Sequence, residues 1–373
     1  MNDTGIMWKM SSMIAISGEL DDLFINDTPM IDVRAPVEFT RGAFPTADNL
    51  PIMSDEERHQ VGICYEESGP EAAERLGHEL VSGDIREYRV GRWTHFLARN
   101  PGARLYCFRG GQRSRIACQW LNEIGFEVSR INGGYKRMRN HLLKVFDNLP
   151  DLVILSGRTG TGKTDFLVDF TQAIDLERLA NHRGSAFGGR ITPQPSQIDF
   201  ENSTAIQFLK LRDEPEILLE DESRLIGRVN LPPALQEKMK QSPIMMIEEP
   251  LSDRVDRIYD EYIETQWDEY LEHYGSDAES EFETYLLKAV DGIRKRLGGV
   301  AHQEIREQMQ QAGADHRRSD SLEGHRIWIE TLLSDYYDPM YSYQMEKKAD
   351  RIRIRAPRDE LVAWYAEHQG ELK

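Results

Sequence analysis

Two short segments carry the residue types that could do chemistry. The first runs Cys107-Phe108-Arg109-Gly110-Gly111-Gln112-Arg113-Ser114. The N–H groups of such a glycine-containing loop, the start of the helix that follows it and two guanidinium groups all favour a thiolate. We therefore expect Cys107, Arg109 and Arg113 to be catalytic, with the thiolate attacking a sulfur, selenium or phosphorus atom carried on an anion. The alternative is an inert, buried cysteine in a glycine-rich turn.

The second segment, Gly157-Arg158-Thr159-Gly160-Thr161-Gly162-Lys163-Thr164, matches the phosphate-binding pattern G-x-x-x-x-G-K-[ST]. Gly157, Gly160 and Gly162 would let backbone N–H groups wrap a diphosphate. Lys163 would bind its outer oxygens, and Thr164 would hold Mg²⁺. The pattern predicts that a di- or triphosphate is bound. It does not say whether ATP is hydrolysed.

Two later segments could complete this phosphate site. The run at residues 217–222 ends in Glu-Asp-Glu after an apolar stretch, so Asp221, or Glu222, could bind a metal through water. A possible Mg²⁺ site is thus assigned to Thr164 and Asp221, although a solvated strand end explains the acids equally well. The glycine-rich loop at 182–190 carries Arg183, which we expect on the phosphates; a plain surface loop is the alternative.

The elements that must position these segments alternate between strand and helix. Apolar runs predict buried strands, and spacing of three and four predicts helices. Expected strands lie at residues 30–33, 105–107, 128–131, 152–155, 217–219, 244–247 and 351–355. Expected helices lie at residues 113–125, 135–148 and 166–174, and through most of 252–311. The β-α-β order predicts an α/β protein with parallel sheets.

We divide the chain into three parts on this pattern. Residues 1–140 are expected to form a first parallel-sheet domain. Residues 141–340 are expected to form a P-loop NTPase-like α/β domain with helical additions, and 341–373 a C-terminal extension with a basic strand and a helix. Pro150 marks the start of the second sheet.

Composition limits the class of protein. Of 373 residues, 39% are hydrophobic, and no apolar run approaches membrane-spanning length. The N-terminus lacks the features of a secretory signal, so we expect a cytoplasmic protein. Three cysteines (Cys64, Cys107 and Cys118) cannot all pair and lack zinc-site spacing. Nothing in the chain demands a partner subunit, so we expect a monomer.

The charge is uneven along the chain. A net charge of −18 speaks against a nucleic-acid partner. Yet the stretch from Arg86 to Arg115 contains eight arginines and a single acidic residue, Glu87. This stretch could bind a polyanion, although solvated helix faces explain it about as well.

The N-terminal part resembles a rhodanese domain. Residues 32–39 (Asp-Val-Arg-Ala-Pro-Val-Glu-Phe) and 42–51 are similar to its first half, and 132–135 (Asn-Gly-Gly-Tyr) to its closing segment. The resemblance implies that Cys107 carries a chalcogen. Five residues separate Cys107 from Arg113, which also matches the Cys-x5-Arg loop of cysteine phosphatases. A phosphatase or sulfurtransferase fused to a nucleotide-binding domain is therefore one alternative, and a non-catalytic RNA- or nucleotide-binding regulator is another.

A rhodanese-like part followed by a P-loop part resembles the tRNA 2-selenouridine synthase family over nearly the whole chain. The matching segments are residues 107–114, 157–164, 182–188, 219–227 and 336–341. The last, Tyr-Tyr-Asp-Pro-Met-Tyr, has no generic P-loop explanation. Tyr336, Tyr337, Tyr341 and Tyr343 could stack bases or line a prenyl pocket, with core packing the expected role of at least half of them.

The family resemblance implies a transferase that acts on tRNA carrying 2-thiouridine at the wobble position. Geranyl diphosphate first alkylates the sulfur. Selenophosphate then supplies selenium through Cys107, as a selanylsulfide, and geranylthiol leaves. The P-loop would bind geranyl diphosphate, with possible help from Mg²⁺, and a selenophosphate supply enzyme would be a partner. Basic stretches at 86–115 and 136–144, with Arg351, Arg353 and Arg355, would contact tRNA.

Overall fold

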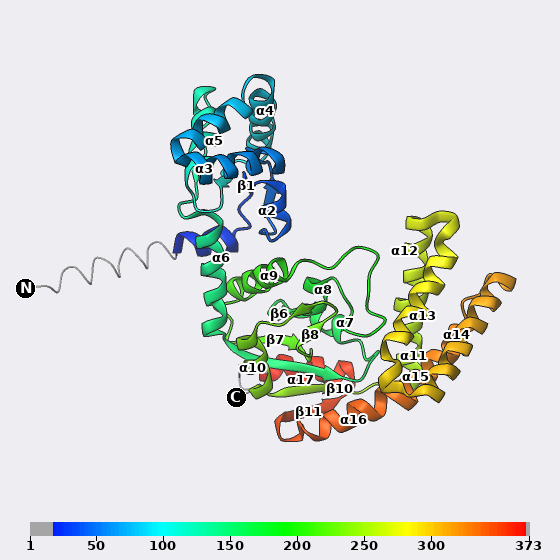
Figure 1. The fold of residues 1–373 in the computed structure, drawn as a ribbon. Helices are drawn as coiled ribbons and strands as arrows, with labels where there is room; N and C mark the ends of the chain where they lie inside the picture. Colours follow the sequence, from blue (N-terminus) through cyan, green and yellow to red (C-terminus); the bar gives the residue numbers. More distant parts are fainter. Residues whose placement is uncertain (1–17, 371–373) are drawn as a thin grey trace, which may run out of the picture. The chain divides into compact units, whose positions relative to one another are not determined.

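The computed structural model describes residues 18–370 and contains two compact units. Unit 1 comprises the chain up to Asn148 together with Ser196–Arg212, and unit 2 comprises Leu149–Pro195 and the chain from Asp213 onward. Each unit has its own parallel β-sheet and its own covering helices (Figure 1). The α/β class with parallel sheets, expected from the sequence, is thus confirmed.

Unit 1 contains a four-stranded sheet in the order β2-β1-β3-β4, with every printed pairing parallel. Its elements are β1 (Met30–Asp32), α2 (Pro36–Thr40), β2 (Ala47–Asn49), α3 (Asp55–Leu80), α4 (Gly83–Arg99), β3 (Arg104–Tyr106), α5 (Gln112–Glu123), β4 (Ser129–Arg130), α6 (Gly134–Val145), η1 (Phe146–Asn148) and α9 (Gln197–Lys210). The strands and helices expected around Cys107 are therefore present. Helix α3 is broken at Gly69, where φ is +82° and Pro70 follows.

The core of unit 1 lies between the sheet and helices α3, α4 and α5. Trp93 is fully buried, stacks on Trp120 with 6.2 Å between the ring centroids, and donates its indole N–H to the carbonyl of Leu50 at 2.8 Å. Cys107 belongs to the same buried cluster. The loop cysteine is thus attached to a rigid core at the carboxyl end of β3.

Unit 2 is built on a five-stranded parallel sheet in the order β11-β10-β5-β7-β6. The sheet and its connections comprise β5 (Asp151–Gly157), α7 (Lys163–Val168), β6 (Ala173–Ile174), α8 (Leu176–Ala180), β7 (Glu216–Glu220), the hairpin β8 (Leu225–Ile226) and β9 (Val229–Asn230), α10 (Pro233–Gln241), β10 (Ile244–Ile247), η5 (Ala349–Arg351), β11 (Ile352–Ala356) and α17 (Arg358–His368). Strands β5, β7 and β10 are almost wholly buried, as their continuous apolar runs predict.

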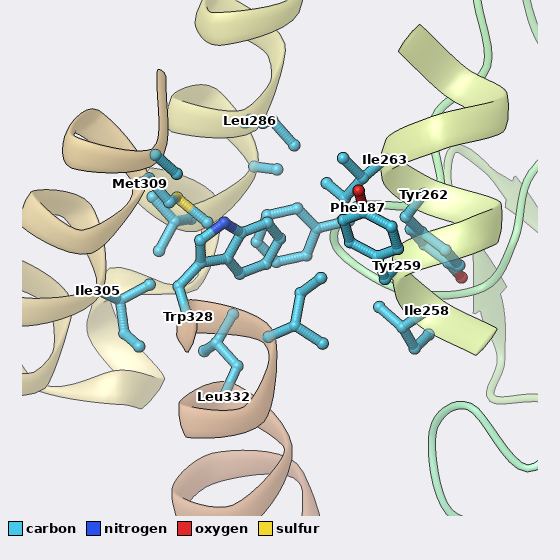
Figure 2. Packing of buried hydrophobic residues seen from close by; sticks show 14 of the residues in the cluster. Phe187, Ile258, Tyr259, Tyr262, Ile263, Leu286, Ile305, Met309, Trp328 and Leu332 are labelled. Atoms are coloured by element: carbon cyan, nitrogen blue, oxygen red, sulfur yellow. The ribbon is translucent and has the colours of Figure 1, made fainter. Parts of the chain in front are cut away.

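A helical subregion follows β10 in the chain. It consists of α11 (Leu251–Tyr259), η2 (Asp260–Glu264), α12 (Thr265–Tyr274), η3 (Gly275–Asp277), α13 (Ala278–Leu297), α14 (Gly299–Ser319), α15 (His325–Leu332), η4 (Leu333–Tyr337) and α16 (Asp338–Glu346). Its core centres on Trp328, which stacks on Phe187 with 5.4 Å between the ring centroids (Figure 2). Because Phe187 comes from the loop after α8, this core fixes that loop beside the sheet.

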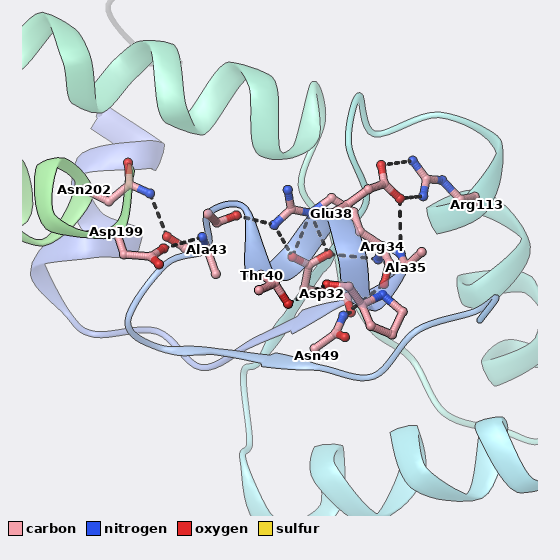
Figure 3. A network of polar contacts seen from close by, with 12 residues as sticks. Asp32, Arg34, Ala35, Glu38, Thr40, Ala43, Asn49, Arg113, Asp199 and Asn202 are labelled. Atoms are coloured by element: carbon pink, nitrogen blue, oxygen red, sulfur yellow. Dashed lines mark hydrogen bonds and ion pairs between the residues drawn. The ribbon is translucent and has the colours of Figure 1, made fainter. Parts of the chain in front are cut away.

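The observed units differ from the expected domains in two ways. The helix α9, expected within the second domain, packs in unit 1, where Asn202 donates to the carbonyl of Ala43 at 2.6 Å and Asp199 accepts from the N–H of Ala43 (Figure 3). The C-terminal basic strand is no separate extension, because β11 pairs with β10 and closes one side of the second sheet. Its alternation is confirmed, with Arg353 and Arg355 exposed.

The helix expected over residues 166–174 is shorter than its spacing suggests. Helix α7 ends at Val168, and Ala173–Ile174 form strand β6 beside β7. Ile174 is still buried. It therefore packs in the core as a strand residue. The expected helix was too long because the spacing of apolar residues in a short segment fits a helix and a buried strand equally well.

Protonation of His325 is expected to destabilise unit 2 in mild acid. Burial lowers the pKa of this imidazole to about 4, and Trp328 donates its indole N–H to His325 Nδ1 at 2.9 Å. The unfolded chain takes up the proton near pH 6.5, so the folded state loses stability as pH falls from 6.5 towards 4. Between pH 7 and pH 5 the loss should be about 2 kcal/mol. Urea unfolding at both pH values should show this for the wild type and a clearly smaller loss for His325→Gln; equal losses would contradict it.

Among the described residues, no helix has the length and apolar character needed to cross a membrane.

Candidate functional site

The loop of Cys107 is held by the start of α6. Tyr135 N–H donates to the carbonyl of Cys107 and Lys136 N–H to that of Phe108, each at 2.9 Å. Gly134 allows this contact, because a Cβ there would lie 2.1 Å from the Cys107 carbonyl oxygen, and its φ is +54°. In a trans peptide the N–H points opposite to the preceding C=O, so the next N–H groups point away from α6, as an anion-binding loop requires.

The thiol of Cys107 is enclosed. Its side chain is 3% exposed, and its S–H donates to Ser114 Oγ, with 3.3 Å between Sγ and Oγ. Ser114 Oγ in turn donates to the Gly111 carbonyl. Ser114 therefore binds the sulfur at the first turn of α5. On that same helix, burial raises the pKa of Cys118, and the neighbouring Cys107 adds to this effect. Of the two thiols, Cys107 is the one at the loop.

The structure separates the two loop arginines from the sulfur. Arg113 donates to both carboxylate oxygens of Glu38, at 3.0 Å in the longer bond (Figure 3). Burial raises the pKa of Glu38, but the guanidinium of Arg113 outweighs it and the net pKa is lowered. Arg109 is exposed, and its guanidinium lies 5.9 Å from the ring centroid of Phe108. In the described chain, neither arginine makes a hydrogen bond or ion pair with Cys107.

A buried ion pair supports the strand next to this loop. Asp32 ends β1, Arg34 follows it, and two hydrogen bonds from Arg34 Nε join them, at 2.8 and 3.1 Å. Arg34 also donates to the Gly42 carbonyl and lies 3.9 Å from the ring centroid of Tyr135. This pair ties β1 to the start of α6 and so indirectly fixes the Cys107 loop.

The basic stretch at 86–115 is partly neutralised within unit 1. Arg86 pairs with Glu123, Arg89 with Glu57, Arg113 with Glu38 and Arg115 with Glu74. Arg92, Arg99 and Arg109 are exposed. The free positive charge of this stretch is therefore smaller than the sequence count suggests.

In unit 2 the P-loop follows β5, the central strand of the sheet. Gly160 and Gly162 have φ values of +83° and +70°, and a Cβ at Gly160 would lie 2.9 Å from the Arg254 carbonyl oxygen. Arg254 donates to the carbonyl of Thr159 at 3.3 Å, and Arg257 to that of Gly160 at 2.8 Å. These bonds from α11 occupy the carbonyl side of the loop and hold it in the shape that phosphate binding needs.

Asp338 explains part of the Tyr-Tyr-Asp-Pro-Met-Tyr segment. Its carboxylate binds both terminal nitrogens of Arg254, at 2.8 and 2.7 Å, and Arg254 is 1% exposed. Tyr341, three residues later, lies near Lys163. Burial lowers the pKa of Lys163, but Tyr341 and nearby glutamates outweigh it and the net pKa is raised. Lys163 is thus a cation at neutral pH, and its Nζ lies 3.3 Å from the Gly157 carbonyl oxygen.

The residues expected to hold Mg²⁺ do not fit that role as they stand. Both carboxylate oxygens of Asp221 accept from Lys348 Nζ, at 2.8 and 2.6 Å, and Ser156 Oγ donates to one of them at 2.8 Å. Thr164 is exposed on α7. A cation at Asp221 would have to displace an ammonium group that already neutralises it.

Three glutamates cluster beside Lys163 instead. Glu177, Glu220 and Glu222 each place a carboxylate oxygen within 4.8 Å of the other two. Burial and the neighbouring carboxylates raise all three pKa values, to about 7 for Glu177 and about 8 for Glu222, while Lys163 opposes the shift at these two. The three acids at the end of β7 thus have different partners. Asp221 pairs with Lys348, whereas Glu220 and Glu222 belong to the glutamate cluster.

The loop at 182–190 is fastened to the helical subregion. Arg183 donates to Gln266 Oε1 at 2.8 Å, and its guanidinium lies 5.1 Å from the ring centroid of Tyr262. Gly184 rather than Arg183 approaches the glutamates, since a Cβ there would lie 2.2 Å from Glu177 Oε1. The expected contact of Arg183 with phosphates would need Arg183 to leave Gln266.

A narrow apolar crevice with a free volume of about 30 Å³ opens beside the P-loop. Its walls come from the P-loop, the 182–190 loop and the helical subregion. The lining residues are Thr159, Ser185, Phe187, Ile258, Tyr262, Trp328, Ile329, Leu332, Leu333 and Tyr337. Figure 2 shows Phe187, Trp328 and Leu332 close together in this region. Tyr337 lines this crevice and also belongs to the buried hydrophobic cluster, in keeping with the core packing expected for at least half of these tyrosines.

Sequence reasoning missed several residues that shape these sites. Arg254 and Arg257 give no motif signal, and Lys348 lies 127 positions from Asp221. Glu177 stands in an ordinary helix start. Asp338 was within a recognised segment, but only its tyrosines received roles.

Comparisons with known proteins give one consistent result. Residues 150–372 match the family described as tRNA 2-selenouridine synthase AAA domain. Curated proteins named tRNA 2-selenouridine synthase are similar over nearly their whole length. The protein from Marinobacter nauticus is 49% identical, covering 92% of this chain and 95% of its own. Those from Sulfurovum sp. and Shewanella oneidensis are 46% and 45% identical, each covering 95% of this chain, and 98% and 96% of their own lengths.

Proposed function

The chain belongs to the tRNA 2-selenouridine synthase family, and we propose that it converts wobble 2-thiouridine into 2-selenouridine in two steps. It is an enzyme of tRNA modification. In the first step geranyl diphosphate alkylates the sulfur of the uridine, and diphosphate leaves. In the second step the selenium of selenophosphate bonds to C2 of the base and geranylthiol leaves, while the P–Se bond is broken and its phosphoryl group is released to water as phosphate. A cytoplasmic enzyme acting as a monomer fits this role.

One observation carries the first step: the P-loop and an apolar crevice share a wall. Thr159 belongs to both. A diphosphate on the P-loop would therefore bring its organic substituent to Phe187, Trp328 and the neighbouring aliphatic side chains. A nucleotide would place a polar ribose there, which an apolar crevice disfavours. An isoprenoid chain suits the apolar lining, and the crevice, with a free volume of about 30 Å³, would have to widen to admit it.

The chemistry explains why alkylation precedes selenium transfer. The neutral thiocarbonyl sulfur of 2-thiouridine is a poor leaving group, whereas a geranylated sulfur leaves as a thiolate. Lys163 would stabilise the negative charge that develops on the departing diphosphate. Because Asp221 forms an ion pair with Lys348, neither proposed step uses a metal ion at Asp221.

The second step is assigned to the Cys107 loop. The N–H groups after Cys107 would bind the phosphate of the selenium donor, and Arg109 is exposed at the same loop. We propose that this phosphate replaces Glu38 as the partner of Arg113, since both offer paired oxygens to one guanidinium. The Cys107 thiolate then attacks the phosphorus of the donor, which breaks the P–Se bond and frees the selenium for C2 of the base, and water releases phosphate from the phosphorylated cysteine.

The tRNA is proposed to bind through arginines that remain free of ion pairs. Arg92 and Arg99 of α4 and Arg353 and Arg355 of β11 are exposed. Phosphate contacts of this kind weaken as salt is added, because bound counterions are released on association.

Nucleoside mass spectrometry of tRNA tests the function. Cells that lack the gene should contain wobble 2-thiouridine and no 2-selenouridine, and a plasmid copy should restore the selenonucleoside. A deletion strain with unchanged 2-selenouridine would rule the assignment out. Release of phosphate from aryl phosphates without any tRNA would support a Cys-x5-Arg phosphatase in its place.

A further inference from the structure

The glutamate cluster beside Lys163 has no task in the proposed reaction. Glu177 stands at the start of α8, Glu220 ends β7, and Glu222 follows two residues later. These elements meet at the carboxyl edge of a parallel sheet, where α/β proteins bind their ligands. One oxygen from each carboxylate lies within 4.8 Å of the others. Such a grouping brings three carboxyl groups together, and a bound cation would favour their ionised forms.

A buried oxygen in this cluster is unpartnered. Glu220 is 0% exposed, and its Oε1 accepts the N–H of Glu177 at 2.7 Å. Its Oε2 is buried and has no hydrogen-bond partner within residues 18–370. Leaving a buried acceptor unpaired is unfavourable, because its hydrogen bond to water is lost and not replaced. A bound cation would remove this cost and would also relieve the repulsion between the three carboxylates.

Gly184 lies against the cluster without a side chain, since a Cβ there would lie 2.2 Å from Glu177 Oε1 and 3.0 Å from Glu222 Oε1. Lys163 is a cation that acts on all three carboxylates, and it also interacts with Tyr341. An acid between two cluster members, Asp221, is already neutralised by Lys348.

We propose that Glu177, Glu220 and Glu222 bind one divalent cation of the hard, oxygen-preferring class, Mg²⁺ or Mn²⁺, and that Asp221 is not a ligand. Such ions take carboxylate oxygens at about 2.0–2.6 Å, so two ligands on opposite sides are separated by about 4–5 Å. The spread of the cluster matches this range. The strand-end acid usually assigned to the metal in a P-loop protein is here replaced by its two neighbours and a glutamate from α8. The site does not depend on the selenium chemistry.

Manganese binding to the full-length protein, free of substrates, tests this proposal. Titration followed by electron paramagnetic resonance of free Mn²⁺ should show one site per chain. Glu177→Gln and Glu222→Gln should each weaken binding at least about tenfold. Glu237→Gln, an exposed glutamate on α10, is the matched control and should bind as the wild type does.

Asp221→Asn separates the two possible ligand sets. Its affinity for Mn²⁺ should stay within about threefold of the wild type, as expected for a neighbour that does not coordinate the ion. A thermal melt of each variant supplies a second measurement, because Mn²⁺ should raise the Tm of the wild type and Asp221→Asn but not of the two glutamate variants. No Mn²⁺ binding by the wild type at millimolar concentration would overturn the proposal. So would a loss confined to Asp221→Asn.

Discussion

Replacing Cys107 by alanine is expected to lower selenium incorporation into tRNA by roughly 1,000-fold or more, the scale seen when a reacting side chain is removed. Geranylation should continue at its normal rate. The sulfur is the loop atom that can bond to the selenium donor. The position is only 3% exposed, and the smaller alanine side chain fits within it. Mass spectrometry of nucleosides should therefore show S-geranyl-2-thiouridine accumulating in place of 2-selenouridine.

Cys118→Ala is the matched control for this experiment. Cys118 lies on α5, and burial raises the pKa of its thiol. The variant should keep both reactions within about twofold, as expected for a packing residue that does not react. If Cys107→Ala retained a tenth of the wild-type selenium transfer with an intact fold, Cys107 would not be the reacting group, and the role of the loop would reduce to anion binding.

Replacing Lys163 by alanine is expected to slow geranylation by roughly 100- to 1,000-fold, which is typical when one stabilising group is removed from a transition state. Lys163 lies at the P-loop with its Nζ near Gly157, and its raised pKa keeps it charged at neutral pH. Selenium transfer to tRNA that already carries the geranyl group should proceed normally. The two half-reactions should be assayed separately, one with geranyl diphosphate and one with geranylated tRNA.

Lys288→Ala provides the control, because Lys288 is an exposed residue of α13 in the same unit. It should leave both half-reactions unchanged. Equal slowing of both half-reactions by Lys163→Ala would argue that the P-loop serves the whole reaction or the fold, and not the prenyl donor alone. Together with the Cys107 variant, this experiment asks whether the two loops serve separate steps.

The parts of the fold predicted correctly are those specified by short stretches of sequence. Strands β1, β3 and β5 are apolar runs, and the segment after Cys107 has helical spacing with a glycine at its end. The P-loop was predicted with its preceding strand because its glycines mark positive φ angles. In each case the signal and the structure it specifies lie within about ten residues.

The parts that escaped prediction depend on pairs far apart in the chain. Arg113 and Glu38 are 75 positions apart, and Arg113 taken alone suggests a contact with the ligand of the Cys107 loop. Their ion pair removes Arg113 from the sulfur, which no local pattern could indicate. The same holds for Asp221. Its place in the sequence predicts metal binding, but in the folded protein it forms an ion pair with Lys348. Charged residues near a motif reveal their chemical capacity, and tertiary pairing decides how that capacity is used.

The path of the chain between the two units has a practical consequence. Helix α9 belongs to unit 1, yet it is encoded between β6 and β7 of unit 2. The polypeptide therefore passes from one unit to the other three times, and no single cut separates them. A gene truncated after Asn148 would lack Asp199 and Asn202, which hold Ala43, while the complementary fragment would carry α9 with Phe200 and Phe208 uncovered. A single truncation at this point therefore removes contacts from both units.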